Sequence, residues 1–170
     1  MRTVLVTGPI GGGKSAACRY LASKGIPVYD SDSRTKALYG SVPGLKALIE
    51  KELDIRFEDL AIIFTDPERK RRLEDIVYPL VAEDIRRWKS GQDSEVVAVE
   101  SANALGSPLF DGLFDSVLLV TAPLETRIAR NPKAASRSSL QHFENVRADW
   151  TVVNDGTKEE LYKKLDTLAL

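Results

Sequence analysis

Residues 7–16 of the chain, TGPIGGGKSA, contain a glycine pattern that few folds can use. Its spacing is Gly8-x-x-x-x-Gly13-Lys14-Ser15, in which successive backbone N–H groups can surround a polyphosphate. Glycine permits the positive φ angles and the close backbone approach that such a nest requires. The pattern therefore predicts a phosphate-binding loop, with Lys14 reaching the β- and γ-phosphates of a nucleotide and the Ser15 hydroxyl ligating Mg²⁺.

The segments on both sides of this loop fit the same prediction. Residues 3–6, TVLV, form a short apolar run typical of a strand buried on both faces, and residues 14–25 have helical spacing that ends at Gly25. A glycine-rich β-hairpin turn is the alternative, but a helical pattern stands where a second strand would be needed. The candidate nucleotide-binding residues of the loop are Gly8, Gly11, Gly12, Gly13, Lys14, Ser15 and Ala16.

Strand-like and helix-like segments alternate along the rest of the chain. The further strand candidates are residues 26–30, 95–100, 116–121 and 150–155, and a helical pattern over 158–168 closes the chain. This alternation predicts an α/β fold, the three-layer P-loop NTPase arrangement with a five-stranded parallel sheet. In such sheets the ligand lies beyond the carboxyl ends of the strands. That rim should collect the loop and the polar residues Asp30, Asp32, Glu100, Ser101, Thr121, Asn154 and Asp155.

The stretch between the second and third strands has a helical pattern throughout. Asp66 is suited to cap a helix, Pro67 to its first position, and apolar residues then recur at helical spacing over 73–88. Pro79 falls inside this pattern and predicts a kink. We expect residues from about 34 to 90 to form a helical insertion that leans over the crevice. Its basic residues could meet an anionic substrate, but acidic residues are interleaved with them, which favours a solvated face.

Composition restricts the class of protein further. The 170 residues carry a net charge of −1, so no overall electrostatic attraction to nucleic acid or a membrane surface is expected. Cys18 is the one cysteine, which excludes an internal disulfide and is best explained as a buried helix residue. The chain shows neither a secretory signal nor a membrane-spanning stretch, so we expect a cytoplasmic enzyme with a small-molecule substrate. The sequence gives no indication of oligomeric state.

Two sets of charged residues suit phosphoryl transfer at this rim. Asp32 is the candidate that accepts or orients the proton of an attacking hydroxyl, although helix capping by Asp30 and Asp32 is an alternative that can hold at the same time. Arg130 and Arg137 follow the fourth strand in a segment suited to a closing lid, where arginine charge would stabilise the migrating group. Each arginine can equally be explained as a surface residue.

With these motifs in place, the chain resembles the dephospho-CoA kinase family nearly from end to end. The segments VYDSD, IFTDPERKRRLEDIVYPLV and ADWTVVNDGTKEEL carry the resemblance beside the phosphate loop. It implies ATP- and Mg²⁺-dependent phosphorylation of the ribose 3′-hydroxyl of dephospho-CoA, the last step of coenzyme A biosynthesis. It also implies that Asp32 faces that hydroxyl, that the 34–90 insertion binds the CoA moiety, that a lid covers about 125–147, and that Asn154 and Asp155 belong to an adenine-side loop.

Three departures from the family pattern fall on the acceptor and lid side. Tyr78 stands where the family usually has His, and the segment VESANALGSPLF lacks an acidic residue at the matching place. The lid between Arg130 and Arg137 is shorter than the family's by about two helical turns. Two further hypotheses therefore stay open: a related small-molecule P-loop kinase with another acceptor, and a nucleotide-binding protein with reduced or lost kinase activity.

Overall fold

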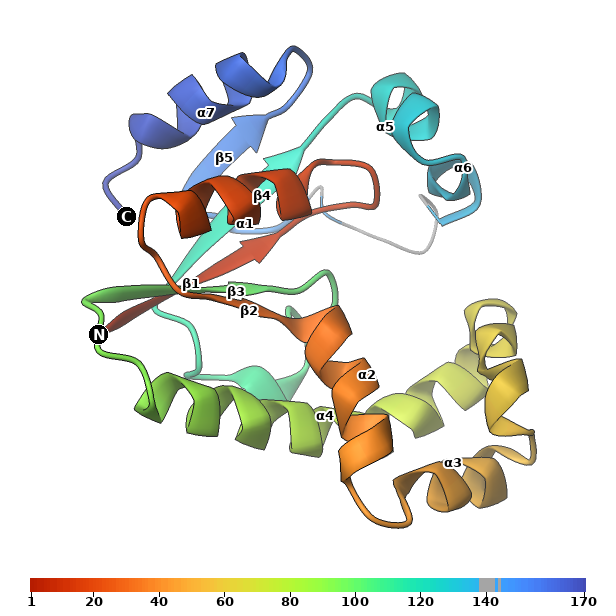
Figure 1. Ribbon diagram of the computed structural model, residues 1–170. Helices are drawn as coiled ribbons and strands as arrows, with labels where there is room; N and C mark the ends of the chain where they lie inside the picture. The colour runs from red at the N-terminus through yellow and green to blue at the C-terminus, as the bar shows by residue number, and fades with distance from the viewer. Residues whose placement is uncertain (138–142, 144) are drawn as a thin grey trace. The chain divides into compact units, whose positions relative to one another are not determined.

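A computed structural model describes residues 1–137, 143 and 145–170 (Figure 1). The chain forms two compact units. The sheet unit contains Met1–Asp30 and Gly91–Leu170, and the helical unit contains Ser31–Ser90. In the described part of the chain, no helix has both the length and the apolar character needed to cross a membrane.

A five-stranded parallel sheet forms the centre of the sheet unit, as the sequence predicts. Its strands are β1 (Arg2–Thr7), β2 (Val28–Asp30), β3 (Val96–Glu100), β4 (Ser116–Thr121) and β5 (Trp150–Val153). They are hydrogen-bonded in the order β2-β3-β1-β4-β5, and every pair is parallel. The central strand β1 is buried from Thr3 to Thr7, which explains its unbroken run of β-branched and apolar residues.

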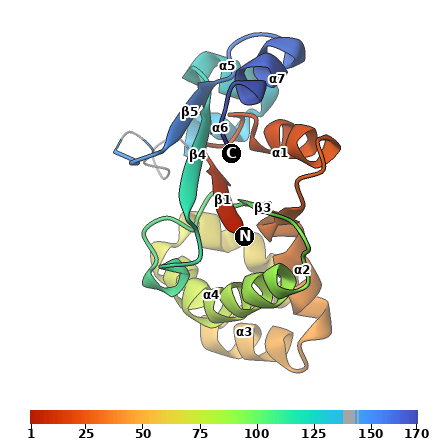
Figure 2. The ribbon, with the colours of Figure 1, turned by 90° about the vertical axis from the view of Figure 1, so that its left-hand side faces the viewer.

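Four α-helices accompany the sheet among the described residues of this unit. They are α1 (Lys14–Ser23), α5 (Leu124–Arg130), α6 (Lys133–Arg137) and α7 (Lys158–Asp166), and a short 3₁₀ helix, η2 (Pro108–Phe110), lies between β3 and β4. Helices α1 and α7 lie on the same side of the sheet (Figure 2), and Tyr20 of α1 stacks on Tyr162 of α7 with ring centroids 4.1 Å apart. Leu21, Leu161 and Leu165 are buried in the core between these helices and the sheet.

The helical unit contains α2 (Ser31–Ser41), α3 (Leu45–Leu53), the 3₁₀ helix η1 (Phe57–Thr65) and α4 (Pro67–Ser90). The predicted start of α4 is confirmed, because Asp66 Oδ1 accepts hydrogen bonds from the backbone N–H groups of Glu68 at 3.1 Å and Arg69 at 3.0 Å. Helix α4 continues through Pro79 without interruption. Arg34 of α2 donates two hydrogen bonds, of 2.8 and 2.7 Å, to the Asp84 carboxylate of α4, which joins the two helices.

Candidate active site

The phosphate loop follows β1 and leads directly into α1. Gly8, Gly11 and Gly13 have φ angles of +144°, +78° and +107°, a conformation that residues with side chains rarely adopt. The surrounding space is also filled: a Cβ on Gly8 would overlap the Val120 carbonyl oxygen, and one on Gly13 would overlap the Asn154 side chain. Backbone conformation and packing therefore both require glycine at these positions.

Lys14, Ser15 and Ala16 begin α1, so the loop meets the positive end of a helix dipole. The Lys14 ammonium Nζ donates to the carbonyl oxygens of Gly8 at 2.8 Å and Pro9 at 3.3 Å. This keeps a cation over the loop, where an anionic ligand would meet it.

Glu100, one of the polar residues expected at the rim, contacts Ser15, the predicted magnesium ligand. Glu100 ends β3, and its Oε1 accepts a 2.7 Å hydrogen bond from the Ser15 hydroxyl. Asp30 ends β2 and is the register partner of Glu100, so a second carboxylate lies on the neighbouring strand. The signal that could have singled out Glu100 is its position at the carboxyl end of the strand next to β1.

The oxygen atoms of this set fit a hard cation. Hydroxyl and carboxylate oxygens are the ligands that Mg²⁺ prefers, and Mg²⁺ commonly uses few protein ligands together with substrate phosphates. Among the described residues there is no group of three or more His, Cys, Asp or Glu side chains that could hold a metal by themselves. Ser15, Glu100 and Asp30 therefore suit a cation shared with a bound polyphosphate.

Cys18 is one turn further along α1. Its side chain is buried, and burial together with the neighbouring Glu100 carboxylate raises the pKa of the thiol. The prediction of a buried helix cysteine is confirmed.

Asn154 directly follows β5 and is buried. Its side-chain Nδ2 donates to the carbonyl oxygen of Gly12 at 3.1 Å, so the amide contacts the phosphate loop. Asp155 is exposed and pairs with Lys164 at 3.1 Å, a hydrogen bond that lowers the pKa of the Asp155 carboxyl. Asn154 therefore contacts the phosphate loop, whereas Asp155 forms an exposed ion pair with Lys164.

The two candidate arginines end different helices. Arg130 ends α5, and its Nη1 donates to the carbonyl oxygens of Asn154 at 2.9 Å and Gly11 at 3.4 Å, which places its charge beside the phosphate loop. Arg137 ends α6 and is half-buried. The remainder of the expected lid, about 125–147, includes residues 138–142 and 144, which lie outside the described residues.

Asp32 and Tyr78 belong to the helical unit. Asp32 is exposed in the first turn of α2, a helix that begins at Ser31, so its action on a substrate hydroxyl stays a prediction. Tyr78 lies on α4, where burial and the Glu74 carboxylate raise the pKa of its hydroxyl. The Tyr78 side chain is therefore neutral across the physiological range.

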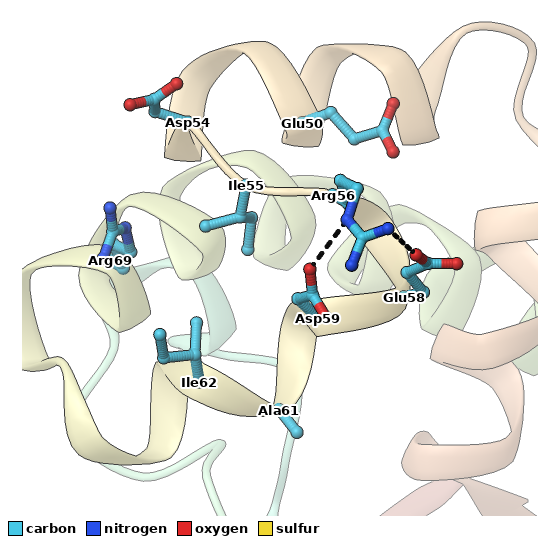
Figure 3. A pocket seen from close by; sticks show the side chains of 9 residues that line it. All are labelled: Glu50, Asp54, Ile55, Arg56, Glu58, Asp59, Ala61, Ile62 and Arg69. Atoms are coloured by element: carbon cyan, nitrogen blue, oxygen red, sulfur yellow. Dashed lines mark hydrogen bonds and ion pairs between the residues drawn. The ribbon is translucent and has the colours of Figure 1, made fainter.

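A pocket of about 820 Å³ also lies in the helical unit (Figure 3). Its lining residues are Glu50, Asp54, Ile55, Arg56, Glu58, Asp59, Ala61, Ile62 and Arg69. Arg56 forms ion pairs with Glu58 and Asp59, as Figure 3 shows, and Arg69 Nε donates to the Leu53 carbonyl oxygen at 2.9 Å. The predicted site residues are not among those that line it.

The fold and the loop define a P-loop kinase. A crystal structure of a Thermus thermophilus protein matches with a TM-score of 0.77 and 30% identity, covering 97% of this chain and 94% of that one. The shikimate kinase of Aquifex aeolicus shares the fold, with a TM-score of 0.54 and 16% identity over 96% of this chain and 92% of that one.

The family model for dephospho-CoA kinase matches residues 2–159. The dephospho-CoA kinase of Porphyromonas gingivalis is 37% identical over 91% of this chain and 86% of its own length. The chain belongs to the dephospho-CoA kinase family. This membership confirms the resemblance, the α/β P-loop fold and the kinase class that the sequence predicts.

Proposed function

We propose that the protein transfers the γ-phosphoryl group of ATP to the ribose 3′-hydroxyl of dephospho-CoA, with Mg²⁺ bound at Ser15. The observation that carries the proposal is the intact phosphate loop, with Lys14 and Ser15 at the start of α1, in a chain that matches the dephospho-CoA kinase model over residues 2–159. Phosphoryl transfer depends mainly on positioning and on charge stabilisation, and the loop supplies both.

Lys14 supplies the first positive charge. Its ammonium group has two backbone carbonyl oxygens, of Gly8 and Pro9, as hydrogen-bond acceptors. Hydrogen bonds from an ammonium to a phosphate are charge-assisted and stronger than those to a neutral carbonyl, so ATP should draw Lys14 onto its β- and γ-phosphates. The loop N–H groups and the start of α1 add to the same attraction.

Ser15 is the residue proposed to hold Mg²⁺. Because Glu100 Oε1 accepts the Ser15 hydroxyl proton in a 2.7 Å hydrogen bond, a lone pair of the Ser15 oxygen stays available to a cation. Asp30 on the adjacent strand end adds a second carboxylate that can accept hydrogen bonds from metal-bound water. When bound, Mg²⁺ neutralises charge on the phosphate oxygens.

Asp32, Arg130 and Arg137 are the remaining residues proposed to act in phosphoryl transfer. Asp32 is proposed to accept the proton of the ribose 3′-hydroxyl, a role that needs an exposed carboxylate. Arg130, whose guanidinium lies beside Gly11, is proposed to stabilise charge on the migrating phosphoryl group. Arg137 is proposed to contribute from the lid, and the helical unit is proposed to bind the CoA moiety.

A P-loop kinase with another acceptor is the second candidate. Tyr78 favours it, because a half-buried tyrosine beside Glu74 offers a larger and neutral side chain where the family usually has His. The shortened lid favours a third reading, slow transfer, because less of the site would be closed off from water.

An acceptor panel tests the proposal. ADP formation is measured with MgATP and either no acceptor, dephospho-CoA, AMP or shikimate, and the product is located by mass spectrometry. We expect ADP formation to require dephospho-CoA and to yield a 3′-phosphorylated product. Equal or faster turnover with another acceptor would contradict the proposal and favour the second candidate.

A further inference from the structure

The carbonyl groups of the phosphate loop accept hydrogen bonds from several parts of the chain. A nest that binds an anion directs N–H groups inward, so its carbonyl groups must find partners elsewhere. Lys14 donates to the carbonyl oxygens of Gly8 and Pro9, the Gly12 N–H also donates to that of Pro9 at 3.0 Å, and Arg130 donates to that of Gly11. The carbonyl oxygen of Gly12 accepts from a neutral side chain, the Asn154 amide.

Asn154 is held in place by its own backbone. Its N–H donates to the Thr121 carbonyl oxygen at 2.7 Å, which continues the β4–β5 pairing by one residue. Its carbonyl oxygen accepts from Arg130 Nη1 at 2.9 Å. With 7% of the residue exposed, the side chain has little freedom to leave the loop.

The hydrogen bond from Asn154 to the Gly12 carbonyl oxygen also fixes the orientation of the peptide plane between Gly12 and Gly13. In a trans peptide the C=O of Gly12 and the N–H of Gly13 point in opposite directions. Holding the Gly12 oxygen on Asn154 Nδ2, 3.1 Å away, therefore directs the Gly13 N–H to the other side of the loop. The Asn154 side chain also fills the space that a Cβ on Gly13 would occupy, so glycine and asparagine fit each other.

We propose that Asn154 is a positioning residue that sets the phosphate loop for binding, rather than a residue that recognises the nucleotide base. The inference rests on the proposed function only in taking a nucleotide polyphosphate as the ligand. It differs from the role that the family resemblance implies, because an adenine-side asparagine would act on the base. The two roles differ in which half of the nucleotide is affected when the amide is removed.

Separate phosphate and base ligands distinguish these roles. Binding of tripolyphosphate is measured by calorimetry and of adenosine by NMR titration, for the parent protein, Asn154→Ala and Asn154→Asp. Thr151→Ala serves as the control, because Thr151 is an exposed residue of β5 three positions earlier. Circular dichroism establishes that each variant is folded at the temperature of measurement.

We expect Asn154→Ala to weaken tripolyphosphate binding by about tenfold, the size expected when a buried carbonyl loses its donor, and to leave adenosine binding within about twofold. Asn154→Asp should weaken tripolyphosphate binding more, since it places an acceptor and a charge against the Gly12 oxygen. In the kinase assay, Asn154→Ala should raise the KM for ATP while the KM for the acceptor stays unchanged. Thr151→Ala should match the parent.

Three results would overturn the proposal. They are a parallel loss of adenosine binding, an effect of Asn154→Asp without one of Asn154→Ala, and failure of both variants to fold, which would make Asn154 a stability residue. Failure of the proposed function gives a different result. If only the acceptor assignment fails, the parent protein still binds tripolyphosphate and the Asn154 variants still test the loop; if the phosphate-loop assignment fails, the parent protein itself binds neither tripolyphosphate nor ATP.

Discussion

The phosphate loop and helix α4 use charged and polar side chains in opposite ways. At the loop, donors and acceptors come from distant parts of the chain: Ser15 contacts Glu100, 85 residues away, and Gly12 contacts Asn154, 142 residues away. On α4 most of the ion pairs are local and exposed, such as Glu68–Arg72 at a separation of four residues, and the pair of Asp84 with Arg34 of α2 is the exception. Local exposed pairs contribute little to stability. The phosphate loop, by contrast, is held in its conformation by hydrogen bonds to residues at the ends of several strands. Substitutions should therefore matter far more at the loop.

The largest effect is expected at Lys14. Lys14→Ala removes the ammonium that neutralises the β- and γ-phosphates, so phosphoryl transfer should fall by about a thousandfold and ATP affinity by at least about tenfold. Calorimetry and a kinase assay measure the two effects. Lys51→Ala, at an exposed position of α3, is the matched control. Unchanged ATP affinity in folded Lys14→Ala would refute the phosphate-loop assignment.

Asp32 extends the comparison to a carboxylate on the helical unit. Asp32→Asn keeps the shape of the side chain and some favourable interaction with the first turn of α2, but it cannot take up a proton. Transfer should drop by about a hundredfold or more, with ATP affinity nearly unchanged. Asp75→Asn, exposed on α4, should behave as the parent. If Asp32→Asn phosphorylates the acceptor at the parental rate, the role of Asp32 is limited to stabilising the first turn of α2.

The Arg34–Asp84 pair sharpens the contrast inside the helical unit. Asp84 is 8% exposed and receives two hydrogen bonds from Arg34, so it is the α4 charge that most resembles the loop contacts. Arg34→Leu should lower the free energy of unfolding by about 1–3 kcal/mol, because a nearly buried carboxylate loses its bidentate partner. Denaturant unfolding measures the change. Arg34→Lys should recover part of it, because lysine keeps the charge but loses the fork, and a stability of Arg34→Lys equal to that of the parent would show that the fork geometry contributes nothing.

The smallest effect is expected at Arg72. Its pair with Glu68 is 2.8 Å long, with 55% and 65% of the two side chains exposed. Arg72→Gln should change the free energy of unfolding by no more than about 0.5 kcal/mol. A loss comparable to that of Arg34→Leu in the same denaturant titration would erase the distinction between local and distant pairs.

Local patterns allowed much of the fold to be predicted from the sequence. The glycine spacing, the apolar run of β1 and the cap at Asp66 each depend on residues close together in the chain, and the structure contains all three elements. The 3₁₀ helix Phe57–Thr65 was not separated from its α-helical neighbours, because a short apolar segment has no distinctive period. The contacts of Glu100 and Asn154 could not be predicted, because they depend on strand order and side-chain direction.

The central claim, a dephospho-CoA kinase built on this phosphate loop, is tested most directly by the stoichiometry of the reaction. ADP and the 3′-phosphorylated product are quantified together under saturating MgATP and dephospho-CoA. The account predicts product formation with an ADP-to-product ratio at or somewhat above one, since a short lid excludes water less completely. ADP formation that is independent of dephospho-CoA and yields no phosphorylated product would contradict it.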